Sequence, residues 1–574
     1  MYFRIIAAII PIGLPRKAGN SHPRYNRTVT KTTAPTAPSV GFISLGCPKN
    51  LVDSEVMMGL LHRAGARLTS NPEDAEILIV NTCSFIDTAK QESVDTILEM
   101  ARHKTEGRAR KLIVAGCLVE RYRDEIQKSI PEVDAVVGTG ELESILEAAG
   151  LAGVPPVPRN WGPGNSPNSP SPFNILTAAA AQTHPGQESQ SGTHKHPEDH
   201  HRAVGQGFSP GILAAESGRA LAPEVTSRPE GDHREQAGRF SRDDWDGAAS
   251  ALPTYLYDEN TTRVLTTPKS SAYIKIADGC AHPCTFCVIP NLRGKFRSRR
   301  FESVVAEARQ LVAQGIREIT LIGQDTTCYG EDLGLKDGLA TLLDELARIP
   351  NLRWLRFLYA YPNRITAKLL DTIARHDNIV KYLDVPLQHA SPDVLKRMKR
   401  GAGADIFLKT IAKVRAAVPG IVLRTSFIVG FPGESLRDFE ILEEFIKEAK
   451  FDWLGVFNYS DEEGSAAFPL DAKVPKRTIE SRKRRLMKLQ QGISKRAKQQ
   501  WVGRELVLLA EGPSEETDLL WEARTQFHAP EIDGKVYIND FGDLESLEPG
   551  RFYNAQITEA HDYDLVARIV SGPL

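Results

Sequence analysis

The sequence predicts an α/β protein in three folded parts: an amino-terminal Rossmann-like domain with a parallel sheet, a partial (βα)6 barrel, and a small OB-like β-barrel. Three observations predict it. Apolar runs that end in cysteine recur between residues 40 and 150, six further apolar runs alternate with helical patterns between 262 and 500, and short strands with turn signals fill 501–574. A chain of 574 residues is long enough for several domains.

The first domain, 40–150, contains three runs typical of buried parallel strands: VGFISLGC, EILIVNTC and KLIVAGC. They end at Cys47, Cys83 and Cys117, which are 36 and 34 residues apart, about one strand-helix-strand period. The carboxyl ends of parallel strands share one edge of a sheet, so we expect the three thiols to converge there. We interpret them as a three-thiolate metal site. The alternative is three buried core cysteines.

A second group of cysteines follows the apolar stretch AYIKIA. Cys280, Cys284 and Cys287 form the CxxxCxxC run GCAHPCTFC. Three thiolates at this spacing can ligate three irons of a 4Fe-4S cluster and leave the fourth iron open to a substrate. Zinc sites usually have two CxxC pairs or histidines, so a zinc knuckle is the weaker alternative.

The segment 262–500 is expected to form the partial barrel. Six βα repeats are too few for a closed eight-stranded barrel, and the reactive face should lie at the carboxyl ends of the strands. The expected strands are AYIKIADG, EITLIGQD, WLRFLY, KYLDVPLQ, LRTSFIVG and WLGVFNYS. Polar residues cluster at these ends: Asp278, Gln324, Asp325, Asp384, Gln388, Asn458 and Tyr459.

Two further segments of this part have several possible roles. The turn GFPGE, 430–434, follows the fifth strand, and its glycines allow a backbone to approach a ligand closely, although the same pattern is typical of a simple chain reversal. Residues 471–500 form a basic helical stretch with 11 Lys and Arg against 2 acidic residues. This stretch is suited either to RNA contact or to a solvated linking helix.

The carboxyl-terminal part, 501–574, is predicted to be a small β-barrel of the oligonucleotide-binding kind. Residues 504–574 contain 15 Asp and Glu against 5 Lys and Arg, a charge of −10. Such a surface repels phosphates and attracts a basic protein.

Residues 1–39 and 151–261 are expected to be unstructured. The first ten residues are apolar, but Pro11 breaks the run and no clear cleavage site follows. The segment 151–261 is rich in Pro, Gly, Ser and charge, and we interpret its histidines as part of a solvated linker. Nothing in the chain predicts a membrane helix.

The cysteine content indicates the redox compartment. Six of the seven cysteines are assigned as metal ligands, and Cys328 is interpreted as an ordinary free thiol. Ligand thiols must stay reduced, so a cytoplasmic setting is expected. The net charge of −2 gives no overall field that favours nucleic acid.

At this point the motifs resemble a known family. A CxxxCxxC in a partial barrel resembles the radical S-adenosylmethionine (SAM) superfamily. With the upstream three-cysteine domain and a final TRAM barrel, the chain resembles the methylthiotransferases over about 40–150 and 262–572. The motifs SLGCPKN, DGC, YLDVPLQH and SDEEGSAAF resemble the RimO branch, which acts on an aspartate of ribosomal protein S12.

The resemblance implies two 4Fe-4S clusters and SAM. The cluster on Cys280, Cys284 and Cys287 is expected to bind SAM and generate a 5′-deoxyadenosyl radical, which takes hydrogen from the β-carbon of the substrate aspartate. The cluster on Cys47, Cys83 and Cys117 is expected to offer an open iron for sulfide or methylthiolate. The cofactors supply the bond-breaking, and no catalytic side chain is singled out.

The resemblance and the strand-end positions also suggest further contacts and partners. Phe286 is expected to cover the adenine, and Gln324, Gly430, Gly433 and Glu434 are candidate SAM contacts from their positions. The expected partners are ribosomal protein S12 or the small ribosomal subunit and an electron donor such as flavodoxin, with no membrane, no tRNA and a monomeric chain.

Two other functions remain open. A tRNA adenosine methylthiotransferase is favoured by the basic stretch 471–500 and predicts salt-sensitive binding to tRNA. A non-enzymatic metal-binding module would hold zinc for structure and would be colourless, whereas two iron–sulfur clusters would make the protein brown.

Overall fold

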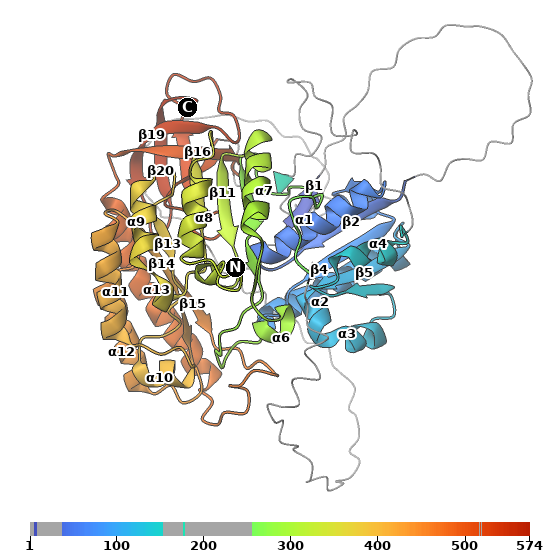
Figure 1. Cartoon of the computed structure of the whole chain (residues 1–574), viewed down its shortest axis with the longest axis horizontal. Helices are drawn as coiled ribbons and strands as arrows, with labels where there is room; N and C mark the ends of the chain where they lie inside the picture. The colour runs from blue at the N-terminus through green and yellow to red at the C-terminus, as the bar shows by residue number, and fades with distance from the viewer. Residues whose placement is uncertain (1–4, 9–36, 153–175, 178–254, 516, 518) are drawn as a thin grey trace, which may run out of the picture. The chain divides into compact units, whose positions relative to one another are not determined.

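The computed structural model describes residues 5–8, 37–152, 176–177, 255–515, 517 and 519–574 (Figure 1). The predicted insertion therefore lies almost wholly outside the described residues, as does most of the predicted amino-terminal extension. Residues 5–8 of that extension form strand β1 (Ile5–Ala8), which pairs antiparallel with β2 (Ser39–Ser44). Strand β7 (Leu176–Thr177), from the insertion, pairs with β1.

The amino-terminal domain is built on a sheet with the order β6-β5-β4-β2-β1-β7, and β3 pairs with β2. Strands β2 to β6 are parallel, as predicted. The remaining elements of this domain are β3 (Arg67–Thr69), β4 (Ile77–Thr82), β5 (Lys111–Gly116), β6 (Ala135–Val137), α1 (Pro48–Arg63), α2 (Asp87–Thr105), α3 (Cys117–Ser129), α4 (Ile145–Ala149), and the 3-10 turns η1 (Pro72–Asp74) and η2 (Leu142–Ser144). Both faces of β4 are buried, because helices cover the sheet on both sides.

The central domain has the six parallel strands that the sequence predicts, in two sets of three. One set has the order β12-β11-β8 and the other β13-β14-β15, and a bridge between Leu355 and Ile379 connects them. The strands are β8 (Ser271–Lys275), β11 (Glu318–Ile322), β12 (Trp354–Phe357), β13 (Tyr382–Asp384), β14 (Val422–Val429) and β15 (Trp453–Asn458). Among the described residues no pairing closes β8 onto β15, so the barrel is partial.

Several strands end before the predicted residue. Tyr359 and Gln388 adopt left-handed backbone angles, with φ of 64° and 73°, where β12 and β13 give way to loops. Gln388 still forms an isolated parallel bridge with Phe427, so backbone pairing with β14 continues past the end of β13.

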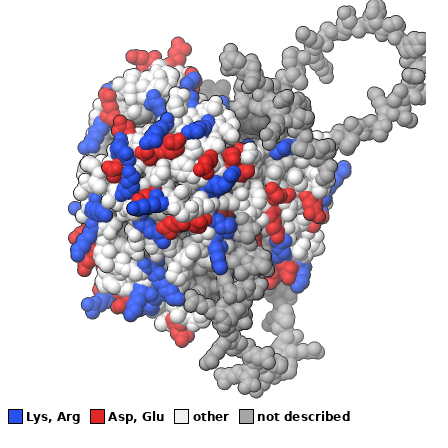
Figure 2. Space-filling model, viewed as in Figure 1, with Lys and Arg blue, Asp and Glu red and all other residues white. Residues whose placement is uncertain are grey.

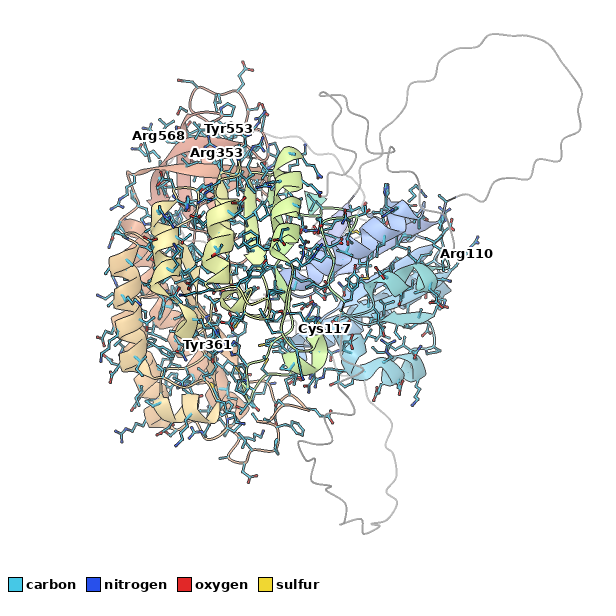
Figure 3. The ribbon with its side chains drawn as sticks, viewed as in Figure 1. Arg110, Cys117, Arg353, Tyr361, Tyr553 and Arg568 are labelled. Carbon is cyan, nitrogen blue, oxygen red and sulfur yellow. The ribbon has the colours of Figure 1, made fainter. Side chains whose placement is uncertain are left out.

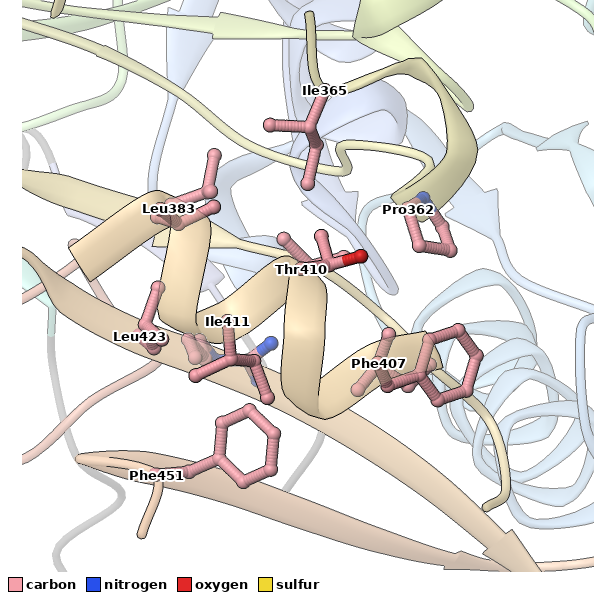
Figure 4. Close-up of a pocket in the computed structure, with 12 residues that line it drawn as sticks. Pro362, Ile365, Leu383, Phe407, Thr410, Ile411, Leu423 and Phe451 are labelled. Carbon is pink, nitrogen blue, oxygen red and sulfur yellow. The ribbon is translucent and has the colours of Figure 1, made fainter. Parts of the chain in front are cut away.

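Helices cover the outside of the barrel (Figure 1). They are α7 (Phe301–Ala313), α8 (Gly338–Leu346), α9 (Ala367–Arg375), α10 (Pro392–Arg397), α11 (Ala404–Ala417), α12 (Leu436–Ala449) and α13 (Lys476–Gln499). A small apolar hollow lies beneath α11, lined by Phe407 and Ile411 together with Leu383, Leu423 and Phe451 (Figure 4). No cysteine lines this hollow, which belongs to the packing between the helices and the strands.

The carboxyl-terminal domain is a closed barrel with the strand order β16-β17-β18-β20-β19. Its strands are β16 (Glu505–Pro513), β17 (Trp521–Thr525), β18 (Val536–Asp540), β19 (Phe552–Ala560) and β20 (Leu565–Ser571). Strands β19 and β20 form a hairpin, in which the amide of His561 donates to the carbonyl of Asp564 at the turn.

Buried ion pairs join this small barrel to the central one. Glu318 on β11 is fully buried and accepts hydrogen bonds from Arg524 at 2.7 Å and from Arg356 at 3.3 Å. Tyr382 donates to Asp533 at 2.7 Å, and the indole N–H of Trp453 donates to the carbonyl of Phe527. The two domains therefore share a buried interface, which fixes the small barrel against the strands.

Charges of both signs are interspersed over the surface seen in Figure 2, and neither sign covers a continuous area there. Among the described helices, none combines the length and the apolar character that crossing a membrane requires.

Candidate metal centre

The three cysteines of the amino-terminal domain lie at the carboxyl ends of neighbouring strands. Cys47 follows β2 and caps α1, Cys83 follows β4 directly, and Cys117 is the first residue of α3, next to the end of β5. Since β5, β4 and β2 are adjacent in the sheet, the three residues share one edge. A Cβ placed on Gly46 would lie 3.1 Å from Sγ of Cys83, so the loop of Cys47 packs directly on that thiol.

A buried polar network holds the cysteine-bearing loops. The Asn50 side chain, on the first turn of α1, donates to the carbonyls of Leu45 and Thr82 at 2.7 and 3.0 Å and so ties the ends of β2 and β4 together. The hydroxyl of Ser84 donates to the carbonyl of Cys117 at 2.9 Å. The thiols thus sit on backbone that is fixed by hydrogen bonds between strands.

The three thiols differ in acidity. Burial raises the pKa of Cys83 strongly, and it raises the pKa of Cys117 to about 11, with the nearby Arg293 acting in the opposite direction. Burial also acts to raise the pKa of Cys47, but the charges of Lys49 and Arg293 outweigh it and the net shift is downward. Thiolates are the metal-binding form, and the surroundings of Cys47 are the ones in this trio that favour it.

The second trio lies in the loop after β9 (Ala277–Asp278), next to the end of β8. Gly279 has a φ of 78°, and a Cβ there would lie 2.2 Å from the carbonyl of Lys295, so only glycine fits at the start of the loop. The amide of Cys280 donates to the carbonyl of Gly294, and the amide of Cys287 to the carbonyl of Cys284. Burial raises the pKa of Cys280 to about 11 and of Cys287 to about 12.

A stack of side chains from two strand ends supports this loop. The ring of His282, within the CxxxCxxC run, lies parallel to the ring of Tyr361 with centroids 4.0 Å apart, and its Nε2 is 2.6 Å from the Asp325 carboxylate. The guanidinium of Arg400 lies over Tyr361 and comes within 3.7 Å of Sγ of Cys284. The stack places a fixed positive charge beside the second trio.

Cys328 is free, as predicted, but it is buried in this neighbourhood. Its thiol donates to Asp325 at 2.9 Å and lies 3.9 Å from His282. Burial and the Asp325 carboxylate raise its pKa. It is therefore held as a neutral hydrogen-bond donor at neutral pH, and this form is not nucleophilic.

The two trios are linked through Arg293 on α6 (Ile289–Arg293), the short helix that follows Cys287. Its guanidinium donates to Asp53 on α1 at 2.9 Å, to Asp278 at 3.2 Å and to the amide oxygen of Asn50 at 3.1 Å. Lys275 completes the network by donating to Asp53 at 2.5 Å and to Asp278 at 2.9 Å. The two domains thus share a buried network of two cations and two carboxylates.

Apolar contact reinforces this link. Cys117 packs with Val288 and Leu292, which flank the second cysteine motif on its carboxyl-terminal side. Figure 3 labels Cys117 on the amino-terminal domain and Tyr361 on the barrel, the two sides that α6 connects.

Two of the predicted SAM contacts, Phe286 and Gln324, occupy partly buried positions. Phe286 is partly buried and packs on the cluster of Val394, Met398 and Phe431. Gln324 donates to Asp278 at 2.9 Å, and its side-chain oxygen is buried without a partner among the described residues. An unsatisfied buried acceptor beside the metal loop is consistent with a ligand donor at that point.

The turn 430–434 is held by hydrogen bonds within the protein. The Glu434 carboxylate accepts from the amides of Gly430 and Phe431 and from Arg482 of α13 at 2.8 Å. Gly430 has a φ of 86°, and a Cβ there would lie 2.4 Å from the Ile479 side chain. The amide of Gly433 donates to the carbonyl of Ala472. The hydrogen bonds found for Glu434 all stay within the protein, so the contact of this turn with SAM remains a prediction.

Sequence reasoning missed the residues that connect the trios. Asp53 lies 222 residues before Lys275 and 240 residues before Arg293, and no periodic pattern marks the three. The one sequence signal for these connecting residues was their closeness to the cysteine motifs. Lys49 and Asn50 follow Cys47 in CPKN, and Arg293 is the last residue of α6, soon after Cys287.

The donor sets fit iron–sulfur clusters. Each trio supplies three thiols whose charges interact with one another, and each has a cation nearby: Arg293 beside the first trio and Arg400 beside the second. Soft thiolates select iron–sulfur clusters or zinc, and three ligands leave a fourth metal position for another molecule.

Comparison with known families divides the chain as the fold does. Residues 39–138 match the Uncharacterized protein family UPF0004, 274–446 match the Radical SAM superfamily, and 502–570 match the TRAM domain. The match to the Radical SAM superfamily implies an iron–sulfur cluster and SAM in the central domain.

Three curated proteins that are similar over nearly the full chain each bear the name ribosomal protein uS12 methylthiotransferase RimO. That of Koribacter versatilis is 63% identical over 92% of this chain and 96% of its own length. That of Solibacter usitatus is 52% identical over 93% and 95%, and that of Myxococcus xanthus 40% identical over 95% and 94%.

Proposed function

The chain belongs to the RimO family of uS12 methylthiotransferases, and we propose that it adds a methylthio group to the β-carbon of an aspartate of ribosomal protein uS12. The observation that carries this proposal is the pair of three-thiol groups at the carboxyl ends of two neighbouring sheets, connected by Arg293. Methylthio transfer needs one centre for radical formation and one for sulfur, and the chain offers two.

The second trio and its surroundings suit the radical-forming centre. When bound there, a 4Fe-4S cluster with SAM supplies the hydrogen-abstracting radical. The protein's own residues hold the loop in place: Gly279 permits its entry, His282 and Tyr361 stack beneath it, and Arg400 balances thiolate charge at Cys284. Gln324 is positioned to accept a hydrogen bond from the bound cofactor.

The first trio suits a second cluster that handles sulfur. Its thiols lie next to Lys49 and Arg293, whose charges favour bound anions such as sulfide or methylthiolate. The burial of Cys83 and Cys117 keeps water from the thiols.

The acidic small barrel supports a basic protein substrate. Asp540, Asp543, Glu545 and Glu548 are all exposed within nine residues at the end of β18 and the loop that follows it. An exposed acidic loop steers basic partners toward it. We therefore infer that uS12, alone or in the small subunit, docks through this loop. As part of the same proposal, the enzyme is monomeric, works in the cytoplasm and receives electrons from a flavodoxin-type donor.

Anaerobic reconstitution tests the proposal. The wild-type enzyme with SAM, sulfide and reductant should add one methylthio group to an aspartate of uS12, read by mass spectrometry of its peptides. Replacing Cys47, Cys83 and Cys117 together by alanine should remove about half of the bound iron, if each trio holds one cluster. Cys328→Ala is the matched control and should keep all of it.

Other outcomes would replace the proposal. Modification of tRNA with no effect on uS12 would make the chain a tRNA enzyme, and bound zinc without iron would make it a structural metal protein. Part of the basic charge of α13 is used within the protein, because Arg482 pairs with Glu434, Arg485 pairs with Glu443, and Lys498 is buried over Trp453.

A further inference from the structure

Lys49 carries a buried ammonium group that pairs with no carboxylate among the described residues, although it lies close enough to Cys47 to lower the pKa of that thiol. It lies on the first turn of α1, two residues after Cys47, and its side chain is only 8% exposed. Among the described residues no carboxylate forms an ion pair with it, and its Nζ instead lies 3.5 Å from the centroid of the Tyr359 ring. A buried cation without a counter-ion is costly, and such groups are usually paired.

The neighbouring buried cations show the contrast. Lys275 and Arg293 both form ion pairs with the same two carboxylates, Asp53 and Asp278, so these carboxylates already neutralise other cations. Lys49, by contrast, forms no ion pair with a carboxylate among the residues that the structure describes.

A residue of the barrel, Tyr359, also fixes the position of the Lys49 ammonium group. Tyr359 lies where β12 ends, with a φ of 64°, and its amide donates to the Asp384 carboxylate at 3.0 Å. A left-handed backbone at a non-glycine residue costs about 1–2 kcal/mol and persists only where the surroundings enforce it. The ring of Tyr359 is thus held at the reactive end of the strands, directly beneath the Lys49 ammonium group.

We propose that Lys49 binds the side-chain carboxylate of the substrate aspartate and so determines which residue receives the methylthio group. This inference rests on the proposed function. The helix start, the first cysteine and the strand end of the barrel meet at this ammonium, so a carboxylate bound there would lie beside Cys47 at the carboxyl end of β12. A neutral asparagine or a nucleobase lacks the charge that this site is built to neutralise.

Two other roles for Lys49 must be separated from this one. It could balance the charge of thiolates at Cys47, or it could bind the carboxylate of SAM. The first role predicts equal losses on every substrate, and the second predicts weaker SAM binding without any change in substrate choice.

The test uses the reconstituted full-length enzyme with uS12 and with a uS12 variant whose modified aspartate is replaced by asparagine. The wild type should bind the aspartate form about 10- to 100-fold more tightly, the range for a charge-assisted hydrogen bond. In Lys49→Met this preference should fall to about 1, and Lys49→Arg should restore part of it. Binding is measured by fluorescence anisotropy, which reads out even without turnover.

Lys498→Met is the matched control, because Lys498 is also a buried lysine over an aromatic ring, with its Nζ 3.6 Å from the Trp453 centroid. Unlike Lys49, it lies on α13, far along the chain from the first cysteine. It should keep the aspartate preference. Iron content and the equilibrium binding of SAM should stay within about twofold of the wild type in Lys49→Met.

The inference is overturned if Lys49→Met retains the aspartate preference or loses binding of both uS12 forms equally. It is also overturned if Lys49→Met loses iron or SAM and Lys49→Arg does not restore the aspartate preference. Failure of the proposed function looks different: wild-type enzyme would then leave uS12 unmodified and bind it no better than an unrelated basic protein.

Discussion

Arg293 donates a hydrogen bond of 2.9 Å to Asp53, and both side chains are almost completely buried. One residue follows the CxxxCxxC motif of the barrel and the other follows the first cysteine of the amino-terminal domain. This contact is one of several that hold the two candidate metal loops together, beside the Lys275–Asp53 pair and the packing of Cys117 on Val288 and Leu292.

Replacing Arg293 by methionine should destabilise the protein by about 3 kcal/mol, because Asp53 and Asp278 lose one of their two cations while remaining buried. Urea unfolding followed by tryptophan fluorescence measures this. Arg309→Met, which removes the exposed pair with Glu345, should cost less than about 1 kcal/mol. Equal losses in the two variants would show that the buried network contributes no more than a surface pair.

Arg400→Met should lower the reduction potential of the cluster at the second trio. A nearby cation favours the more negative, reduced state, and the guanidinium lies 3.7 Å from Sγ of Cys284. Redox titration followed by electron paramagnetic resonance reports the potential, and Arg400→Lys should shift it less. An unchanged potential in Arg400→Met would mean that solvent screens this charge.

Gly430→Ala should cost more than Gly420→Ala, although both glycines have a positive φ. A Cβ at Gly430 would lie 2.4 Å from Ile479, whereas nothing lies within 4 Å at Gly420. We expect about 1 kcal/mol at Gly420 from backbone strain alone and roughly 1–3 kcal/mol more at Gly430 from the clash. Adding Ile479→Ala should recover part of that extra loss, and no recovery would place its origin elsewhere.

Stability should fall as the pH is lowered from about 4.5 to about 2. Burial acts to raise the pKa of Glu318, but Arg524 and Arg356 outweigh it and bring the pKa from 4.5 to about 2. In this window the unfolded chain binds a proton that the folded chain does not, so the stabilisation present above pH 4.5 is lost toward pH 2.

The measurement is a series of urea titrations between about pH 2 and pH 7 on the wild type and on Glu318→Gln. The variant should be less stable at neutral pH and should show a shallower decline in acid. The same slope in both proteins would assign the acid sensitivity to other carboxylates.

Reversing the charge of Asp543 and Glu545 together to lysine should weaken uS12 binding by about tenfold at low salt and reduce its salt dependence. Both residues are exposed on the loop after β18. Glu448→Lys, an exposed reversal on α12, is the control and should leave binding unchanged. Binding that is insensitive to the loop charges would place the uS12 interface elsewhere.

Local patterns were enough to predict the sheets, the strand-end cysteines and the small barrel, because period-2 and buried-strand signals arise from residues close in sequence. They did not reveal that β12 ends at Phe357, two residues before the left-handed Tyr359. Nor did they indicate the link from Arg293 to Asp53, since contacts 240 residues apart depend on domain packing rather than on local sequence.

The packing of Cys117 against Val288 and Leu292 has a consequence for how the enzyme matures. The apolar residues that cover Cys117 belong to a segment made more than 160 residues later in synthesis. Iron delivery to the first trio is thus expected to wait for the barrel, and a fragment that stops at residue 152 should emerge from the ribosome unable to retain metal.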